Sequence, residues 1–153
     1  MDAAEAAGPP PPGGRAVIEI TRREEFSAAH RLFNAAWPAE RNEALYGLCA
    51  NPHYHGHNYV VEVTLRGPVD PETGMIYNLA DLKSLLRRQV VEPLDHKNLN
   101  EDAAPYLKGR IPTAENIAMA IWECLAEHLP PGLLHRVRLF ENERNFVDYR
   151  GGS

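Results

Sequence analysis

Hydrophobic and polar residues alternate with a period of two along four segments of the chain. In the clearest segment, alternate side chains from Tyr59 to Leu65 are apolar and those between them are mostly polar. That spacing places the apolar residues on one face of an extended chain, as in a half-buried strand. The four predicted strands cover residues 16–21, 55–66, 133–141 and 146–149.

Two further segments follow the spacing of a helix. In the first, Leu79, Leu82 and Leu86 fall on one face directly after Asn78, which is a favourable N-cap residue. Proline removes a backbone donor and clashes with the preceding turn, so we expect this helix to end at Pro93.

The second predicted helix begins after Thr113, another favourable N-cap residue. Its apolar stripe contains Ile117, Ile121 and Cys124, so we expect the Cys124 thiol to pack in the core. Pro130 stops the helix before the third strand.

The order of these elements defines the fold class. Strand, strand, helix, helix, strand, strand predicts an α+β domain, with one antiparallel four-stranded sheet and two helices inserted between strands 2 and 3. A single small sheet has two open edges, and open edges favour pairing with other chains. We therefore expect a symmetric oligomer.

Composition narrows the class of partner. The 153 residues are 44% hydrophobic, which suits one globular domain with a sizeable core. The formal net charge of −5 argues against nucleic acid or an anionic membrane surface as the main partner, and no apolar run approaches a membrane span. Only two cysteines occur, which is compatible with a reducing compartment.

Residues 1–15 differ in composition from the rest of the chain. They consist of Ala, Gly and Pro with Met1, two acidic residues and Arg15, and contain a run of four prolines. We expect a disordered N-terminal tail here and a single domain over residues 16–150. The tail lacks the apolar core of a secretory signal and the basic character of a transit peptide, so a cytoplasmic location is expected.

The start of the second strand carries the most informative chemistry. His55 and His57 are two residues apart, so in an extended chain both imidazoles point to one face and reach one cation. Imidazole is the commonest zinc ligand, and a catalytic zinc takes three protein ligands. His30 is the candidate third ligand, although a lone histidine beside apolar residues is more often structural.

Cys49 precedes His55 by six positions across an Asn-Pro turn. A thiol at that spacing lies near the cation without binding it, as a base or nucleophile would. The alternative interpretation is a small buried apolar residue, which is how most free cysteines behave.

With these residues in place, the sequence resembles the 6-pyruvoyl-tetrahydropterin synthase family over residues 17–149. The resemblance rests on several separate motifs that occur in the family's order. They are Phe26-Ser-Ala-Ala-His30-Arg-Leu32, Cys49-x-Asn51-Pro52, His55-Gly-His57-Asn-Tyr59, Asp70-Pro71-x-Thr-Gly74-Met75, Asn78-Leu-Ala-Asp-Leu-Lys83, Leu94-Asp-His-Lys-Asn-Leu99, Thr113-Ala-Glu-Asn116 and Glu141.

The resemblance implies the tunnelling fold, in which the sheets of three subunits close into a barrel. Two such trimers stack into a homohexamer, and the active sites lie between subunits. It also implies a role for each residue that matches a family motif. The zinc ligands are His30, His55 and His57, the base is Cys49, the pair that assists proton transfer is Asp95 and His96, the carboxylate that holds the pterin ring is Glu141, and Thr113 helps to cradle the pterin.

Two departures from the family pattern stand out. Ala114 stands where animal-type members have a second threonine, so we expect one side-chain contact to the pterin to be lost while backbone contacts stay available. His53 and Tyr54 stand where many members have Asn-Gly, and we interpret His53 as a bystander because three ligands already complete the zinc set.

By the same resemblance, the substrate is 7,8-dihydroneopterin triphosphate and the product is 6-pyruvoyl-tetrahydropterin. The redox change is internal to one molecule, in keeping with the absence of a dinucleotide-binding glycine motif. Two alternatives stay open: a 6-carboxy-tetrahydropterin synthase, and a catalytically idle zinc-containing binding module. Whether magnesium acts as an additional cation is also open.

Overall fold

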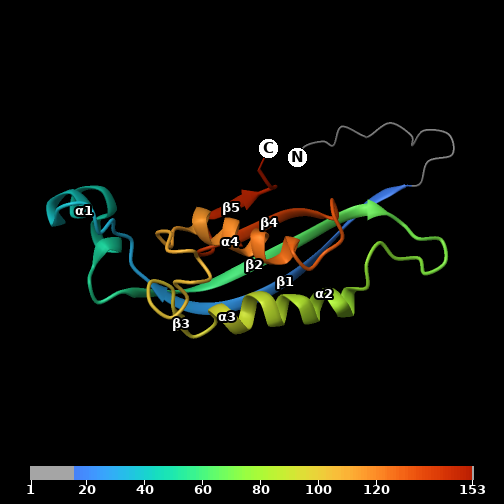
Figure 1. Ribbon diagram of the computed structural model, residues 1–153, viewed down its shortest axis with the longest axis horizontal. Helices are drawn as coiled ribbons and strands as arrows, with labels where there is room; N and C mark the ends of the chain where they lie inside the picture. Colours follow the sequence, from blue (N-terminus) through green and yellow to red (C-terminus); the bar gives the residue numbers. More distant parts are fainter. Residues whose placement is uncertain (1–15, 153) are drawn as a thin grey trace.

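The computed structural model describes residues 16–152, which form one five-stranded sheet with helices on one face (Figure 1). The expected tail of residues 1–15 lies outside the described part. The sheet order is β3-β1-β2-β4-β5. The strands are β1 (Val17–His30), β2 (His55–Pro68), β3 (Lys97–Asn98), β4 (Leu134–Phe140) and β5 (Phe146–Tyr149).

The α+β class is confirmed, but the first strand is longer than the sequence predicted. β1 runs from Val17 through the charged residues 22–25 to His30, and it pairs with β2 along its whole length. Glu24 points into the core side and is only 7% exposed. Its carboxylate lies 2.6 Å from the Arg22 guanidinium and 3.6 Å from that of Arg87. The inward-facing position at residue 24 is therefore filled by a paired charge instead of an apolar side chain.

The fifth strand, β3, was not predicted. It pairs in parallel with β1, opposite Ala28 and Ala29, which corrects the expectation of four antiparallel strands. The Leu99 amide also donates to the Ala29 carbonyl over 2.8 Å. A two-residue strand is too short to show a period in the sequence.

The first predicted helix begins where expected but does not end at Pro93. The Asn78 side chain accepts from the Ala80 amide at 2.8 Å and caps α2 (Leu79–Leu86). A π-helical turn, η2 (Arg87–Val91), then continues into α3 (Glu92–Leu94), with Pro93 in its first turn.

The π turn explains how the helix tolerates this proline. Pro93 cannot donate to the carbonyl four residues earlier, which is that of Gln89. That carbonyl instead accepts from the Tyr106 hydroxyl at 2.8 Å. The Cys124 thiol also approaches it at 3.6 Å, and Cys124 is half-buried rather than a core residue as predicted.

Helix α4 (Ala114–Ala126) is capped by Thr113, whose hydroxyl accepts from the Asn116 amide at 3.2 Å. Its fully buried Ile117 and Ile121 belong to the same core cluster as Val61 and Val63 of β2. Burial of such side chains stabilises the fold by about 1.5–3 kcal/mol each.

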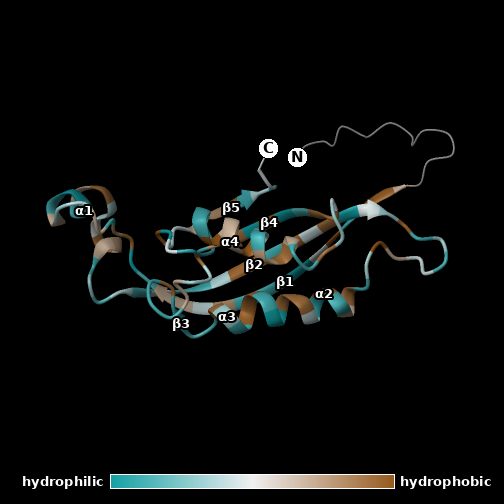
Figure 2. Ribbon diagram, in the orientation of Figure 1, coloured by the Kyte–Doolittle hydropathy of each residue, from teal (hydrophilic) through white to brown (hydrophobic). Residues whose placement is uncertain are grey.

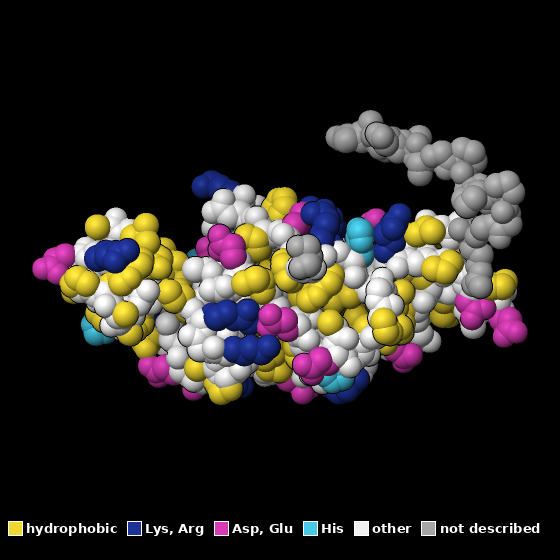
Figure 3. All heavy atoms as spheres, turned by 45° about the horizontal axis from the view of Figure 1, so that its top comes forward, with side chains coloured by type: hydrophobic (Ala, Val, Ile, Leu, Met, Phe, Trp, Pro, Cys, Tyr) yellow, Lys and Arg dark blue, Asp and Glu magenta, His cyan; other side chains and the backbone are white. Residues whose placement is uncertain are grey.

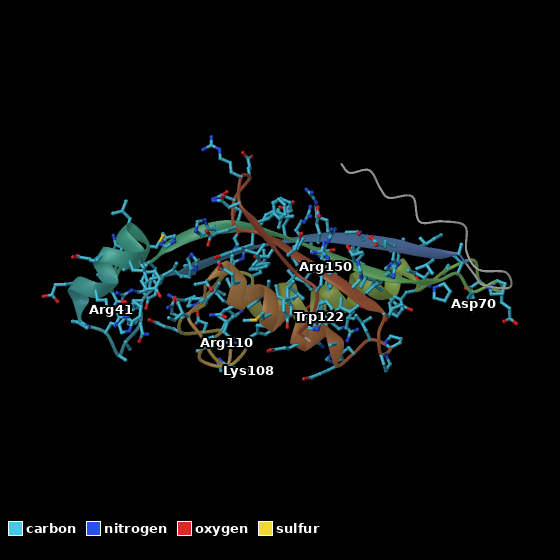
Figure 4. All side chains as sticks on the ribbon, turned by 90° about the horizontal axis from the view of Figure 1, so that it is seen from above. Arg41, Asp70, Lys108, Arg110, Trp122 and Arg150 are labelled. Atoms are coloured by element: carbon cyan, nitrogen blue, oxygen red, sulfur yellow. The ribbon has the colours of Figure 1, made fainter. Side chains whose placement is uncertain are left out.

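The helices cover one face of the sheet and leave the other uncovered (Figure 4). At one end of the long axis, α1 (Ala39–Tyr46) and the 3-10 turn η1 (Gly47–Ala50) form a separate lobe (Figure 1). The opposite end carries the hydrophobic start of β1, where Val17 is 53% exposed (Figure 2). No helix within residues 16–152 has the length and apolar content that a membrane span requires.

Candidate metal centre

The pairing of β1 with β2 brings three histidines together. In this antiparallel register His30 lies opposite His55, and Ala28 lies opposite His57. All three imidazoles therefore share one face of the sheet. Their ring centroids are 4.5–5.1 Å apart, and one nitrogen from each ring lies within 4.8 Å of the others.

His30 is fully buried, and its surroundings fix which nitrogen is free. Its Nδ1 lies 2.8 Å from the Pro112 carbonyl oxygen, which can only accept a hydrogen bond. Nδ1 therefore carries the proton, and the lone pair of Nε2 is left for a cation. The Tyr59 hydroxyl lies 3.3 Å from the same nitrogen and also packs against the ring.

Burial also favours the neutral form of two of these rings. It lowers the pKa of His30 to about 4, and the neighbouring His55 and His57 lower it further, against the Pro112 hydrogen bond that raises it. Burial lowers the pKa of His55 as well, with a smaller contribution from His57. A neutral imidazole is the form that binds a metal ion, so the cluster is poised for ligation at neutral pH.

Glu141 lies beside this cluster, directly after β4. Its Oε2 is 3.7 Å from Nε2 of His30 and 3.9 Å from Nε2 of His57. Glu141 and His57 also line a surface hollow of about 650 Å³. The carboxylate is therefore available to a ligand that approaches the cluster through this hollow.

Cys49 lies in η1 and is half-buried. Its carbonyl accepts from the Leu32 amide at 2.7 Å, which ties the turn to the chain just beyond His30. Within residues 16–152, the group of converging ligand atoms contains the three histidines and no cysteine. The Cys49 thiol is therefore not one of the converging ligands.

Asp95 and His96 are in direct contact, which sequence adjacency alone did not guarantee. Oδ2 of Asp95 lies 2.7 Å from Nδ1 of His96, and Oδ1 accepts from the Ser27 amide at 2.8 Å. These two hydrogen bonds, that of Ser27 first, lower the pKa of Asp95. His96 lines a hollow of about 500 Å³ together with Ser27, Ala29 and Asn58, which lie on the sheet face opposite the three imidazoles. Within one subunit the structure therefore does not bring the pair to the histidine cluster.

Thr113 uses its hydroxyl to cap α4, and its neighbour Pro112 supplies the carbonyl that holds His30. No pattern in the sequence indicates the role of Pro112, because a backbone carbonyl has no residue signature. His53 is exposed and lies outside the histidine cluster.

The residues present fit a divalent metal ion. Three imidazoles, one of them oriented by the hydrogen bond from its other ring nitrogen to Pro112, make a donor set typical of a catalytic centre with an open coordination position. Imidazole suits zinc, copper, iron and nickel, so the donor set by itself does not select one metal.

The chain is similar in sequence to known proteins. Residues 19–152 match the sequence model of the family described as "6-pyruvoyl tetrahydropterin synthase". The chain is 47% identical to the 6-pyruvoyl tetrahydrobiopterin synthase of Pongo abelii, over 91% of this chain and 95% of that protein. It is 31% identical to the 6-carboxy-5,6,7,8-tetrahydropterin synthase of Rickettsia bellii, over 86% of this chain and 89% of that protein.

The fold is likewise similar to that of a solved structure. The 6-pyruvoyl tetrahydropterin synthase of Caenorhabditis elegans superposes with a TM-score of 0.85 at 37% sequence identity. The match covers 90% of this chain and 98% of the nematode protein.

Proposed function

The chain belongs to the 6-pyruvoyl tetrahydropterin synthase family, and from this premise we propose that it converts 7,8-dihydroneopterin triphosphate to 6-pyruvoyl-tetrahydropterin. Triphosphate leaves, two carbinols of the side chain become ketones, and the ring is reduced to the tetrahydro state. The electrons stay within one molecule, so the reaction needs no external oxidant or reductant.

The observation that carries the proposal most is the histidine cluster with Glu141 beside it, within a chain 47% identical to a pyruvoyl-forming relative. The 31% identity to the carboxy-forming relative is much lower. An idle binding module would need neither Cys49 nor the paired Asp95 and His96.

We assign each side chain a step. Glu141 accepts hydrogen bonds from the amino and ring N–H groups of the pterin, and the Thr113 segment cradles the ring. Cys49 removes a proton from a carbinol carbon. The Asp95 carboxylate holds Nδ1 of His96, which leaves Nε2 of His96 to pass a proton to or from the substrate.

The metal in this proposal is zinc, held by His30, His55 and His57. When bound, it supplies Lewis acidity that makes the adjacent carbinol C–H bonds more acidic. Replacing any one of the three histidines with Ala should sharply lower the zinc content, measured by elemental mass spectrometry. His53→Ala is the matched control, and equal zinc loss in that variant would contradict the ligand assignment.

The proposal extends to the whole protein. We propose a single catalytic domain over residues 16–150, a homohexamer built as a dimer of trimers, and a cytoplasmic location. The small-molecule pterin triphosphate is the partner, with no role for nucleic acid or membrane.

One experiment tests the reaction directly. The zinc-loaded protein is incubated with 7,8-dihydroneopterin triphosphate, and the product is identified by mass. We expect 6-pyruvoyl-tetrahydropterin together with triphosphate. A pterin with a shortened side chain would instead indicate the 6-carboxy reaction, and unchanged substrate would refute the enzymatic proposal.

A further inference from the structure

Tyr54 has an unusual backbone conformation for its residue type. Its φ is +68°, in the left-handed region that favours glycine. Strained positions of this kind persist only where the surrounding contacts hold them, and they concentrate at functional sites. The contacts that hold Tyr54 are therefore informative.

The side chain of Tyr54 crosses to another loop. Its hydroxyl donates a hydrogen bond to the carboxylate of Glu101, a residue far away in the sequence. On the backbone side, the Tyr54 amide donates to the Asn51 carbonyl at 3.1 Å, which closes the turn before His55. The hydrogen bond to Glu101 thus joins this turn to the loop after β3.

Each of the two joined loops carries groups of the proposed site. The turn of residues 51–54 lies between Cys49 and His55. The loop that contains Glu101 runs from the pair at 95–96 to Pro112, whose carbonyl orients His30.

We propose that the Tyr54–Glu101 hydrogen bond positions the Cys49 turn against the histidine cluster, which makes Tyr54 and Glu101 positioning residues for the proposed reaction. This inference rests on the function proposed above. Neither side chain is required to touch the substrate.

The metal ligands do not depend on this contact. His55 lies in β2 and is held by its pairing with His30 across the ladder. Cys49 lies outside the strands, in the 3-10 turn η1, and has no ladder to hold it. Two hydrogen bonds to this turn, from the Leu32 amide at 2.7 Å and from Arg31 to the Ala50 carbonyl at 2.8 Å, fix its near side, and the Tyr54–Glu101 contact adds the tie to the loop after β3. Loss of the contact should therefore move the thiol and leave the histidines in place.

The test is Tyr54→Phe, which keeps the ring and removes the hydroxyl. We expect unchanged zinc content, a KM within about twofold, and a kcat lowered roughly 3- to 20-fold, since a misplacement of 1 Å can cost a factor of about 100. Glu101→Ala should lower kcat by the same factor as Tyr54→Phe. Glu101→Gln keeps an acceptor oxygen and should retain kcat within about twofold.

Two controls distinguish a positioning role of the Tyr54–Glu101 contact from a general effect on protein stability. Tyr106→Phe also removes one hydroxyl hydrogen bond, to the Gln89 carbonyl, but Tyr106 packs against the hydrophobic core and is no part of the proposed site, so kcat should stay unchanged. The double variant of Tyr54→Phe with Glu101→Ala should be no slower than either single variant, because both remove the same contact.

Hydrogen exchange tests the contact without using turnover. In Tyr54→Phe, peptides covering residues 48–54 and 99–104 should both exchange faster than in the wild type. Wild-type kcat combined with wild-type exchange would overturn the proposal, and so would a fall in kcat that only parallels zinc loss. If the wild-type protein does not turn over the pterin triphosphate, the proposed function fails, while the exchange data still decide whether the contact orders both loops.

Discussion

At the scale of single residues, burial decides the charge of the metal centre. The His30 ring is fully buried, and its Nδ1 is bonded to the Pro112 carbonyl. Among the described residues, its Nε2 has only a long hydrogen-bond contact, with the Tyr59 hydroxyl at 3.5 Å, so a bound cation would give this nitrogen a stronger partner. Without a metal, protonation of His30 would place a charge in the core beside two further imidazoles, and this cost has a measurable pH dependence.

The metal-free protein should lose stability as the pH falls from about 6.5 to 4. The pKa of His30 is about 4 when folded and 6.5 in the reference state, so between these values the unfolded chain binds more protons. The stabilisation is fully present above pH 6.5 and is lost on acidification, by on the order of 3 kcal/mol at 1.36 kcal/mol per pKa unit. Urea midpoints of chelator-treated protein at pH 7 and 4.5 measure it, and His30→Asn should show a weaker dependence.

Substitution of Cys49 tests whether this residue is a catalytic base or only a packing residue. Cys49→Ala changes the size of the side chain little, so a packing role predicts nearly intact turnover. Removal of a general base costs on the order of 100- to 10,000-fold in rate. We expect that loss with zinc and substrate binding retained, measured by steady-state kinetics and elemental analysis. More than about a tenth of wild-type turnover, or loss of zinc, would refute the assignment.

Glu141 lies close enough to the histidines that its role needs a direct test. As the pterin anchor, Glu141→Gln should weaken pterin binding by about 2 kcal/mol, because the charge-assisted hydrogen bonds become neutral ones. Zinc content should stay constant. Calorimetry with a non-reactive pterin measures the binding free energy. If the zinc content of Glu141→Gln falls in parallel, Glu141 is a metal ligand instead.

The sequence predicted that His55 and His57 share a face, because strand alternation projects side chains at a fixed period. His30 entered the set as a candidate and through the family resemblance, since the long pairing of β1 with β2 that places it opposite His55 was not predicted. The Pro112 carbonyl and the Tyr54–Glu101 contact were not predictable, since both depend on how distant loops fold together.

At the scale of elements, the η2 turn connects the two helical segments. The missing hydrogen bond at Pro93 frees the Gln89 carbonyl, and Tyr106 satisfies it from the loop before α4. Burial raises the pKa of Tyr106, in keeping with a hydroxyl that acts as a donor in the core. The proline that predicted a helix end therefore marks a contact between η2 and the loop before α4.

Tyr106→Phe should lower the free energy of unfolding by about 1–3 kcal/mol, the cost of a buried acceptor that loses its donor. Thermal or urea denaturation of the zinc-loaded protein measures the change. The Cys124 thiol, 3.6 Å from the same carbonyl, is a weak donor and compensates only in part. Unchanged stability would mean that water or the thiol replaces the hydroxyl fully.

Element boundaries were predictable where local chemistry sets them. Asn78 and Thr113 cap their helices as expected, because capping uses neighbouring amides. The continuation of β1 past Arg22 was not predictable, since it depends on ion pairs such as that between Arg23 and Glu62, at 2.6 Å across the strands. Pairing between the strands thus keeps residues 22–25 extended, although their polar sequence does not predict a strand.

At the scale of the whole molecule, one subunit leaves several surfaces without cover. One sheet face carries no helices, and the edge strands β3 and β5 have two and four residues. Apolar side chains also gather on the α1 lobe, where Leu45 is 64% and Leu48 89% exposed (Figure 3). Exposed edges and apolar patches of this kind are typical of subunit interfaces.

The proposed assembly accounts for these surfaces together. If the sheets of three subunits close into a barrel, both edges gain partners, and the uncovered face turns inward. The sequence predicted an oligomer from the open edges alone. The number of subunits depends on sheet curvature, which no local pattern encodes, and it came from the family resemblance.

Sedimentation velocity should therefore give a particle about six times the 17.1 kDa of one subunit. A chain that lacks residues 1–15 is the matched variant, because the interfaces inferred above all lie within residues 16–152. We expect it to form the same assembly, with turnover within about twofold of the full chain. A monomer in either preparation would contradict the hexamer or the domain boundary at residue 16, according to which chain failed. Retained turnover in a monomer would further show that the site needs no second subunit, against the inference that active sites lie between subunits.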